Sequence, residues 1–393
     1  MANIAIMGFG TVGAGVAEVA RMNRDSIAAK LGEEVYVKYI LDVREFPDSP
    51  YADRMIKDFS IIENDPEVEV VVETIGGARV ALDFTRRALK AGKHVVTSNK
   101  ELVATYGREL LQIAEEHNVN YLFEASVGGG IPLLRPLFQC LAANQIEEIA
   151  GILNGTTNYI LTRMVKGGVS FAEALKEAQA KGYAEADPTA DVEGIDAGRK
   201  ICILSDLAWG KEVKPAEVSM EGISALDLKD VGIASAAGYR VKLLGHAIAM
   251  ADGKVAAYVA PHLVSEEVPI ATVDDVFNAV MIRGNAVGDV MFYGRGAGDL
   301  PTASAVMGDV LDVITHRSNR RRIGWNEDAQ LADVKELSMK WYLRGEFSAE
   351  EAEKVCGKIE ILAPGAVITS AVKEEQAKAM AEALNAAVML RVL

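Results

Sequence analysis

The sequence predicts an α/β protein that begins with a doubly wound parallel sheet. An apolar run, Asn3–Met7, breaks into a glycine-rich turn that is followed at once by a helical pattern. A near-continuous run of valines within Glu67–Gly77 is typical of a strand that is buried on both faces. Strand and helix patterns alternate around these segments, as they do when helices connect parallel strands. Together these observations favour a parallel sheet that is covered by helices.

The turn after the first strand has the spacing G-x-G-x-x-G, in Gly8, Gly10 and Gly13. With a strand before it and a helix after it, this motif indicates a Rossmann dinucleotide-binding domain. The first glycine permits the tight turn, the second lets the backbone approach a pyrophosphate, and the third permits close packing of helix on strand. Amides at the start of the helix would bind the phosphates. We therefore expect the cofactor to lie against Gly8, Phe9, Gly10, Thr11, Val12 and Gly13.

The second predicted strand, Val35–Val43, ends in two competing signals. An acidic residue here, Asp42, usually holds the 2′-hydroxyl of NAD, whereas an arginine, Arg44, accommodates the 2′-phosphate of NADP. Both residues could instead be exposed loop residues. The pattern leaves the choice of cofactor open.

Two further segments reach the same edge of the predicted sheet. Thr74 and Gly76 follow the valine-rich strand, and Ser98 and Lys100 follow the strand His94–Thr97. Open parallel sheets bind their ligands at the carboxyl ends of the strands. A lysine at a strand tip is more often a solvated surface residue, but this one also opens a helix at the nucleotide crevice.

The segment Asn120–Leu137 is predicted to be a strand that breaks into three glycines and a proline. The break would expose backbone carbonyls beside one carboxylate, Glu124. Oxygen ligands of this kind suit a hard cation. A glycine-rich strand exit is more often a plain turn, so the pattern alone favours the turn.

The pattern of the sequence changes after Pro136. A strand and a polar turn precede a helix that is expected to start near Asn158, and Asn154 and Thr156 can cap that helix.

Residues 178–200 are the most informative stretch of the chain. They form an acidic loop and then a helix that is predicted to run from Asp191 onward. On that helix Asp196 and Lys200 are four residues apart and share a face. An ammonium beside a carboxylate could recognise an amino group and move a proton. An exposed ion pair with no further role is the commoner interpretation of such a pair alone.

The stretch as a whole resembles the signature of homoserine dehydrogenases, because Ala178, Gly182, Asp187-Pro188, Asp191, Gly194, Asp196 and Lys200 fall at the spacing of that family. GILNGTTNYIL at residues 151–161 and the tripeptide Ser98-Asn99-Lys100 match the family as well. The resemblance extends over about residues 1–320.

The resemblance implies an enzyme that interconverts L-aspartate 4-semialdehyde and L-homoserine with NAD(P)H, in threonine, methionine and isoleucine biosynthesis. It implies that Lys200 is the acid/base, that Lys100 is a second essential lysine, and that Asp196 acts with them. The residues implied to hold or border the substrate are Glu185, Asp191, Asp196, Asn154 and Thr156.

The same resemblance implies further ligands. An arginine at the place of Arg44 favours NADP, while Ser98 and Gly298 would lie near the cofactor. A sodium ion would be held by Glu124 and by the carbonyls of Val127, Gly129 and Ile131.

The resemblance also implies how the domains are divided. We expect a nucleotide-binding domain at 1–135, completed by 298–319, and a substrate-binding and dimerisation domain with an open sheet at 136–297. Such enzymes are homodimers or homotetramers. A linker and a small ferredoxin-like tail, similar to the regulatory ACT module, would occupy 320–393. The Asp-x-Pro-Gly loop of that module is replaced by GEFSAEEAEK at residues 345–354, which puts threonine sensing in doubt.

Composition excludes several classes of protein. A net charge of −15 argues against nucleic-acid binding, because phosphates would repel the chain. No apolar run reaches the length of a membrane span. The first strand begins almost at the N-terminus, which leaves no room for a signal peptide, and the three scattered cysteines suit a reducing cytoplasm. The alternatives are a Rossmann reductase with another substrate, such as a saccharopine or diaminopimelate enzyme, and a non-catalytic NAD(P)-binding regulator.

Overall fold

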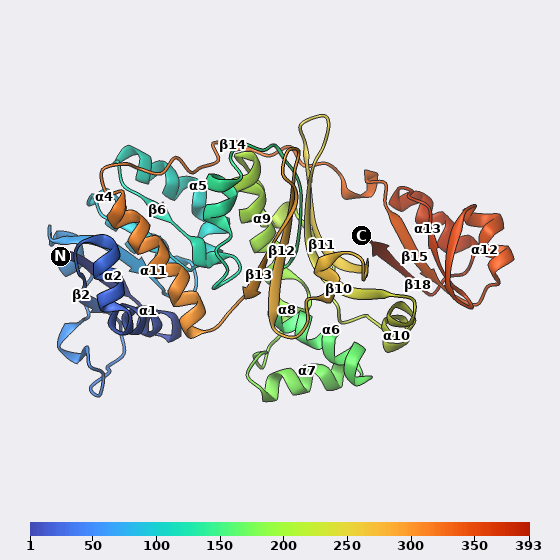
Figure 1. The fold of residues 1–393 in the computed structure, drawn as a ribbon, viewed down its shortest axis with the longest axis horizontal. Coiled ribbons are helices and arrows are strands. Elements are labelled where there is room, and N and C mark those ends of the chain that lie inside the picture. Colours follow the sequence, from blue (N-terminus) through green and yellow to red (C-terminus); the bar gives the residue numbers. More distant parts are fainter. The chain divides into compact units, whose positions relative to one another are not determined.

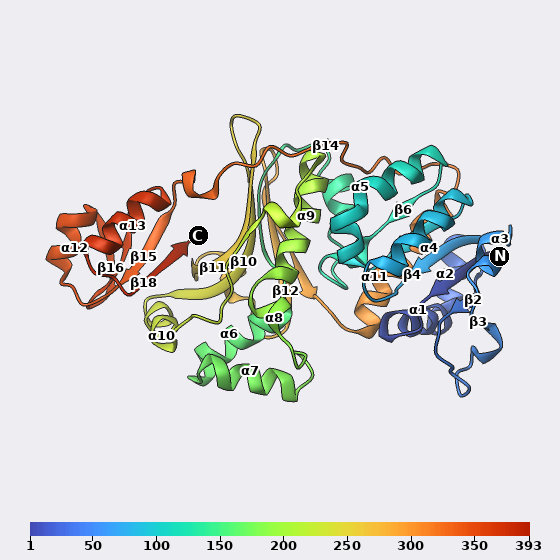
Figure 2. The same ribbon diagram turned by 180° about the vertical axis from the view of Figure 1, so that it is seen from behind.

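The computed structural model describes residues 1–393 and contains two compact units (Figures 1 and 2). Unit 1 consists of Met1–Ala143, Ile203–Pro215 and Gly294–Asp328, and unit 2 consists of Asn144–Cys202, Ala216–Tyr293 and Ala329–Leu393. Each unit is described by itself. The functional domain boundaries given above stay a prediction. None of the helices combines the length and the apolar character that a membrane span requires.

Unit 1 is built on a six-stranded sheet in the order β3-β2-β1-β4-β5-β6, and every neighbouring pair is parallel. The strands are β1 (Ala2–Met7), β2 (Val35–Leu41), β3 (Met55–Ile56), β4 (Val68–Glu73), β5 (His94–Thr97) and β6 (Tyr121–Leu122). The order reverses between β1 and β4, which is where open α/β sheets bind nucleotides. The predicted Rossmann sheet is therefore confirmed. Its last strand is shorter than predicted, because a 3-10 turn at Glu124–Ser126 follows it closely.

Helices cover this sheet. They are α1 (Thr11–Met22), α2 (Arg24–Leu31), α3 (Ser60–Asn64), α4 (Arg79–Lys90), α5 (Lys100–Glu116) and α11 (Asp299–Thr315). The last of these comes from far along the chain and lies beside α1 in both views (Figures 1 and 2). A Cβ added to Gly15 would lie 3.0 Å from the carbonyl oxygen of Asp299, so this glycine permits the two helices to approach closely.

The charged segment after α11 is anchored more firmly than its sequence predicts. Trp325 is only 1% exposed, and it fills the space beside Gly107 of α5, where a Cβ would lie 2.5 Å from the indole ring. Two residues farther on, β14 (Glu327–Asp328) pairs with β8 (Lys211–Glu212). A single aromatic residue produces no periodicity, so the pattern indicated only a linker.

Unit 2 contains a mixed, open sheet in the order β13-β12-β7-β10-β11-β18-β15-β17-β16, with β9 (Ser219–Met220) beside β11. Its first five strands are β13 (Gly288–Arg295), β12 (Phe277–Gly284), β7 (Ile146–Ile152), β10 (Tyr239–Ala249) and β11 (Val255–Ser265). The helices of this part are α6 (Gly155–Gly167), α7 (Phe171–Ala180), α8 (Thr189–Val192), α10 (Leu228–Ala236) and the first part of α9 (Ile195–Trp209), which belongs to unit 2 as far as Cys202. Gly245 of β10 lets α9 approach, since a Cβ there would lie 3.2 Å from Cβ of Ile201. The open sheet of the prediction is confirmed.

The tail has the element order strand-helix-strand-strand-helix-strand, which is ferredoxin-like. Its elements are β15 (Lys340–Arg344), α12 (Ala349–Cys356), β16 (Ile359–Ala363), β17 (Ala366–Thr369), α13 (Glu374–Ala383) and β18 (Val388–Val392). β18 pairs with β11 in parallel, with His262 opposite Arg391, so the tail continues the sheet of unit 2. No pattern in the sequence predicts this pairing. The likeness to the ACT module stays a prediction.

Polar contacts fix the tail to the rest of unit 2. Asp230 of α10 is 1% exposed, accepts a hydrogen bond of 2.8 Å from Tyr342 and pairs with Arg344. Arg391 is 5% exposed, pairs with Glu221 at 2.7 Å and stacks on aromatic rings. Buried charges that are paired in this way restrain the elements that carry them.

Candidate active site

The glycine turn of unit 1 packs against the segment that follows β4. Gly8 has a φ of +91°, and a Cβ there would lie 2.8 Å from the carbonyl oxygen of Thr74. A Cβ on Gly13 would lie 2.0 Å from the carbonyl oxygen of Gly8, so neither position accepts another residue. Thr74 Oγ1 donates to the Gly8 carbonyl at 2.8 Å. Gly10 precedes α1 without a side-chain cap, so the first amides of that helix, which include those of Thr11 and Val12, can bind an anion.

A cavity of about 510 Å³ lies beside this turn. Its lining includes Phe9, Gly10, Thr11, Arg44, Phe46 and Asp299. The residues of the glycine turn and the arginine that follows β2 thus border one hollow, which suits the nucleotide part of a cofactor.

Asp42 and Arg44 form a pair. Asp42 Oδ2 accepts the amide N–H of Phe9 at 2.7 Å, and the guanidinium of Arg44 binds both carboxylate oxygens at 3.0 and 2.8 Å. The arginine hydrogen bond holds the pKa of Asp42 well below its usual range. The side chain of Asp42 is 6% exposed and that of Arg44 is 57% exposed. Asp42 therefore braces the glycine turn, whereas Arg44 presents positive charge.

Lys57 is a neighbouring cation that the sequence did not single out. Its Nζ donates to the carbonyl oxygens of Val43 and Arg44 at 2.7 and 2.8 Å. It follows the two-residue strand β3, and the short polar segment around it carries no recognisable motif.

Asn99 joins the two loops at the ends of β4 and β5. Its Oδ1 caps α5 by accepting the N–H of Leu102 at 3.0 Å. Its Nδ2 donates to the carbonyl oxygens of Ile75 and Gly77 at 3.1 and 2.9 Å. The loop that carries Thr74 and Gly76 is thereby tied to the tip that carries Ser98 and Lys100. The sequence did not indicate this role for Asn99, although an asparagine directly before a helix is a capping signal.

The predicted sodium ligands are oxygen donors, which suits a hard cation, but Glu124 is engaged elsewhere. It is 5% exposed and its carboxylate accepts the backbone N–H groups of Leu133, Leu134 and Arg135 at 2.5, 2.7 and 2.7 Å. The carboxylate therefore binds the backbone that follows the turn containing Val127, Gly129 and Ile131. A sodium ion at this place stays a prediction.

In unit 2, the chain brings together four of the predicted residues. Asn154 Nδ2 donates to Asp191 Oδ1 at 2.7 Å and to Asp196 Oδ2 at 2.9 Å. Lys200 Nζ donates to Asp196 Oδ2 at 2.7 Å and to the carbonyl oxygen of Leu153 at 2.7 Å. Asn154, Asp196 and Lys200 are 5%, 4% and 8% exposed. The lysine and its carboxylate are therefore a buried pair, not the exposed ion pair that the spacing alone favoured.

Two helix boundaries differ from the prediction. The helix expected near Asn158 begins at Gly155, because Asn154 Oδ1 accepts the N–H of Thr157 and caps it earlier. The single helix expected from Asp191 is two helices, α8 and α9, separated by Gly194 with a φ of +80°. The turn at this glycine lets Asp191 contact the same amide group as Asp196.

Two other predicted substrate residues lie on the acidic loop or contact it. Glu185 is exposed, and its carbonyl oxygen accepts Gln179 Nε2 at 3.1 Å. Thr156 Oγ1 donates to the carbonyl oxygen of Tyr183 at 2.6 Å, which holds the loop against α6. In this structure Thr156 positions the loop. Gly298 is the N-cap of α11 in unit 1, with a φ of +119°.

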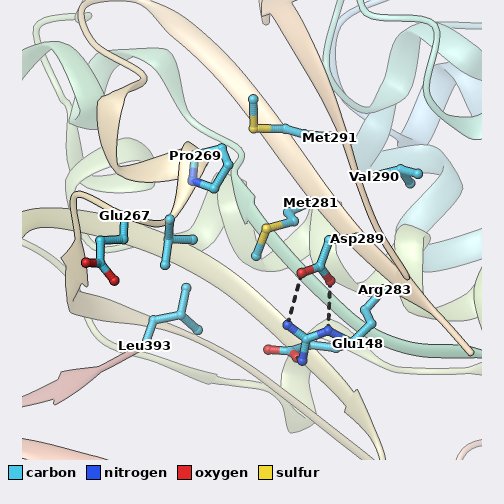
Figure 3. A pocket seen from close by; sticks show the side chains of 10 residues that line it. Glu148, Glu267, Pro269, Met281, Arg283, Asp289, Val290, Met291 and Leu393 are labelled. Atoms are coloured by element: carbon cyan, nitrogen blue, oxygen red, sulfur yellow. Dashed lines mark hydrogen bonds and ion pairs between the residues drawn. The ribbon is translucent and has the colours of Figure 1, made fainter. Parts of the chain in front are cut away.

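The sheet of unit 2 also carries a cavity of about 440 Å³ (Figure 3). Its walls include Pro269, Met281 and Met291. Arg283 is held between Glu148 at 2.6 Å and Asp289 at 2.7 Å, so its charge is already paired (Figure 3). None of the predicted site residues lines this cavity, and we assign it no ligand.

Two histidines of this sheet hold its strands together through hydrogen bonds. His246 binds Glu148 at 2.7 Å and the hydroxyl of Tyr258 at 2.8 Å. That hydroxyl lies 3.2 Å from His262 Nε2, and burial holds the pKa of His262 well below its usual range. The chain of hydrogen bonds fastens β7, β10 and β11 together.

Two family models match the chain. Residues 8–124 match the family model described as homoserine dehydrogenase, NAD binding domain, and residues 132–311 match the model described as homoserine dehydrogenase. The chain belongs to the homoserine dehydrogenase family. The first match contains the glycine turn, and the second contains the cluster of Asn154, Asp191, Asp196 and Lys200.

Individual homoserine dehydrogenases are similar over most of the chain. The enzyme of Neisseria gonorrhoeae is 46% identical over 319 residues, which is 79% of this chain and 72% of that one. The enzyme of Corynebacterium glutamicum is 41% identical over 350 residues, with coverages of 86% and 78%.

Solved structures of homoserine dehydrogenases extend the similarity to the whole fold. The crystal structure from Thiobacillus denitrificans covers 100% of this chain and 98% of its own, with a TM-score of 0.88 and 34% identity. A hyperthermophilic archaeal homoserine dehydrogenase in complex with NADPH has a TM-score of 0.66 and 29% identity, over 79% of this chain and 97% of that one.

Proposed function

We propose that this chain interconverts L-homoserine and L-aspartate 4-semialdehyde with a nicotinamide cofactor, NADP(H) in preference to NAD(H). The buried contact between Lys200 and Asp196, both within the family match, carries the proposal. Lys200 is a buried lysine beside two oxygen acceptors, and such surroundings are typical of a group that transfers protons.

The cofactor would supply or accept the hydride. The glycine turn and the first amides of α1 would bind its pyrophosphate. Arg44 would pair with the 2′-phosphate, and Lys57 adds positive charge beside it. The carboxylate of Asp42 is already paired with Arg44 and with the Phe9 amide, which argues against its binding the 2′-hydroxyl of NAD.

The side chains of unit 2 would handle the proton. The ammonium of Lys200 donates to the carbonyl oxygen of Leu153 and to Asp196. We assign this ammonium the proton exchange with the substrate oxygen. Asp191 and the exposed Glu185 supply negative charge for the substrate ammonium.

Lys100 would act on the same oxygen in a different way. As the first residue of α5 it is positioned by its neighbour Asn99, which caps the helix. We assign its ammonium the stabilisation of negative charge on the substrate oxygen during hydride transfer.

An assay of the purified full chain tests the proposal. We expect NADPH formation from homoserine and NADP⁺, and slower formation of NADH from NAD⁺, when absorbance is followed with each cofactor. A chain that binds NADPH but oxidises homoserine with neither cofactor would be the non-catalytic regulator instead. The same assay with added threonine would test whether the tail senses that amino acid.

Replacing Arg44 with alanine tests the choice of cofactor. We expect the KM for NADPH to rise by about tenfold to a hundredfold, as for the loss of one or two hydrogen bonds to a charged group. The KM for NADH should change little, because the released Asp42 carboxylate can then accept the ribose hydroxyl. Steady-state kinetics with both cofactors measure this. Arg24→Ala, which removes an exposed arginine paired with Glu34, is the matched control. Equal weakening of both cofactors by Arg44→Ala would show that Arg44 does not bind the 2′-phosphate.

We further propose a homodimer or homotetramer, as in the family, and a cytoplasmic location. The three cysteines, Cys140, Cys202 and Cys356, are far apart in the sequence, which agrees with a reducing compartment.

A further inference from the structure

Glu73 is a buried acid that the proposed reaction does not use. It is the last residue of β4, where the preceding valines are fully enclosed, and it is 0% exposed. Its Oε1 accepts the backbone N–H of Ile75 at 2.6 Å, and its Oε2 lies 2.5 Å from the hydroxyl of Thr97 on β5. Both partners are neutral. An apolar residue would fill this place without the cost of burying an acid.

The two contacts of Glu73 close a ring of hydrogen bonds between two loops. Thr97 Oγ1 accepts the N–H of Asn99 at 2.9 Å. Asn99 in turn donates to the carbonyl oxygen of Ile75 at 3.1 Å. Glu73, Thr97, Asn99 and Ile75 therefore connect the loop that contains Thr74 and Gly76 to the tip that contains Ser98 and Lys100. These are the loops at the carboxyl ends of β4 and β5, where open parallel sheets hold their ligands.

The charged groups on the surrounding elements are in other contacts. On β4 itself, Glu69 pairs with Arg317 at 2.8 Å. On α11, Asp309 and Asp312 pair with Arg135 and Arg321. Lys100 and Glu101 begin the helix after Asn99. On β6, Tyr121 is the titratable neighbour whose phenol responds to Glu73, since burial and then the charge of Glu73 raise its pKa well above the usual range.

We infer that Glu73 is a positioning residue that locks the loop at Thr74–Gly76 to the tip at Ser98–Lys100 in the geometry that receives the cofactor. The inference rests on the proposed function only in that these loops are taken to bind NADP(H). It gives a role to an acid that the strand does not need for its own packing.

The hydrogen bonds of Glu73 with Ile75 and Thr97 differ between the two protonation states of its carboxyl group. The ionised carboxylate accepts both the Ile75 N–H and the Thr97 O–H. The protonated acid must itself donate, which leaves the Thr97 hydroxyl hydrogen without its acceptor. Burial raises the pKa of Glu73 to about 7, so the two states exchange near neutral pH. We expect the chain to bind the cofactor more tightly when the Glu73 carboxyl group is ionised.

Stability should change in the opposite direction to cofactor binding. The pKa of Glu73 is about 7 in the folded chain and about 4.5 for an ordinary glutamate, so the folded chain holds this proton more tightly. Its contribution to stability is therefore fully present below about pH 4.5 and declines as the pH rises to 7. Glutamine resembles the protonated acid and removes that decline. At pH 8.5 the glutamine variant should be more stable than the wild type and should bind the cofactor less well.

Glu73→Gln, compared with the wild type between pH 6 and pH 8.5, tests the inference. The probe is NADPH, titrated by fluorescence without substrate, and urea unfolding gives stability. We expect the two proteins to bind NADPH equally at pH 6, and the wild type to bind about tenfold more tightly at pH 8.5, the effect of one hydrogen bond. Glu69→Gln, on the same strand but paired at the surface, is the matched control and should follow the wild type.

Equal NADPH affinity of the glutamine variant and the wild type at pH 8.5 would overturn the inference. So would an affinity ratio that is constant across the pH range, or a variant that loses stability and affinity together. If the glutamine variant does not fold, Thr97→Val removes the hydroxyl from the other side of the lock and should weaken NADPH binding at pH 8.5 in the same way. Because substrate is absent, a chain that fails to oxidise homoserine would refute the proposed function and leave this test intact.

Discussion

Replacing Lys200 with alanine is expected to lower kcat for homoserine oxidation by about 10²- to 10⁴-fold, the usual contribution of a general acid or base. The KM for the cofactor should stay close to that of the wild type, because the contacts of Lys200 with Asp196 and Leu153 place it in the cluster that we assign to the substrate. Steady-state kinetics at several pH values measure both quantities.

Two companion variants sharpen this experiment. Lys200→Arg keeps the positive charge but cannot release a proton near neutral pH, so it should be almost as slow as alanine. Lys176→Ala removes an exposed lysine on α7 and should keep full activity. Wild-type kcat in Lys200→Ala would remove the lysine from the mechanism, whereas loss of folding would appear as a changed circular dichroism spectrum.

Replacing Lys100 with alanine is expected to lower kcat by about 10²- to 10³-fold, as when one charge-stabilising donor is removed from a transition state. The residue does not exchange the proton in our proposal, so the pH dependence of the remaining activity should keep the wild-type shape. Lys100→Arg should recover part of the rate, since it restores a cation at the start of α5.

The matched control for this pair is Lys90→Ala, which removes an exposed lysine at the end of α4. An effect of Lys100→Ala on cofactor affinity alone, with kcat unchanged, would place the lysine in the nucleotide site and not at the reacting oxygen. Equal shifts of the pH profile in the Lys100 and Lys200 variants would contradict the separate roles.

The sequence predicted those parts of the structure that short-range patterns determine. Gly8 and Gly10 lie in the expected turn between strand and helix, and Gly13 lies in the first turn of α1, at the spacing that the motif predicts. Asp196 and Lys200 are four apart on a helix, and their contact follows from helical geometry. The run of buried valines and the alternation of strand and helix patterns predicted the parallel sheet of unit 1, whereas the open sheet of unit 2 was implied by the resemblance.

Contacts between distant residues could not be predicted in this way. The sequence predicted that Asn154 caps a helix. In the structure its side chain also donates to two acids about forty residues farther along the chain. Glu73 looked like an ordinary residue in a valine run, and only the register of β4 against β5 places it opposite Thr97. Gly194 has a positive φ and separates two helices, whereas the acidic residues around it predicted a single helix.

The place of β18 in the sheet has a consequence for how unit 2 assembles during synthesis. This strand lies between β11 and β15, yet Val388–Val392 leaves the ribosome after all the other strands of that sheet. Until it arrives, the neighbouring strands expose backbone groups that could pair with another nascent chain. The ion pair of Arg391 with Glu221 forms only at that late moment. The sheet of unit 2 can therefore be completed only after β18, the last strand of the tail, has been synthesised.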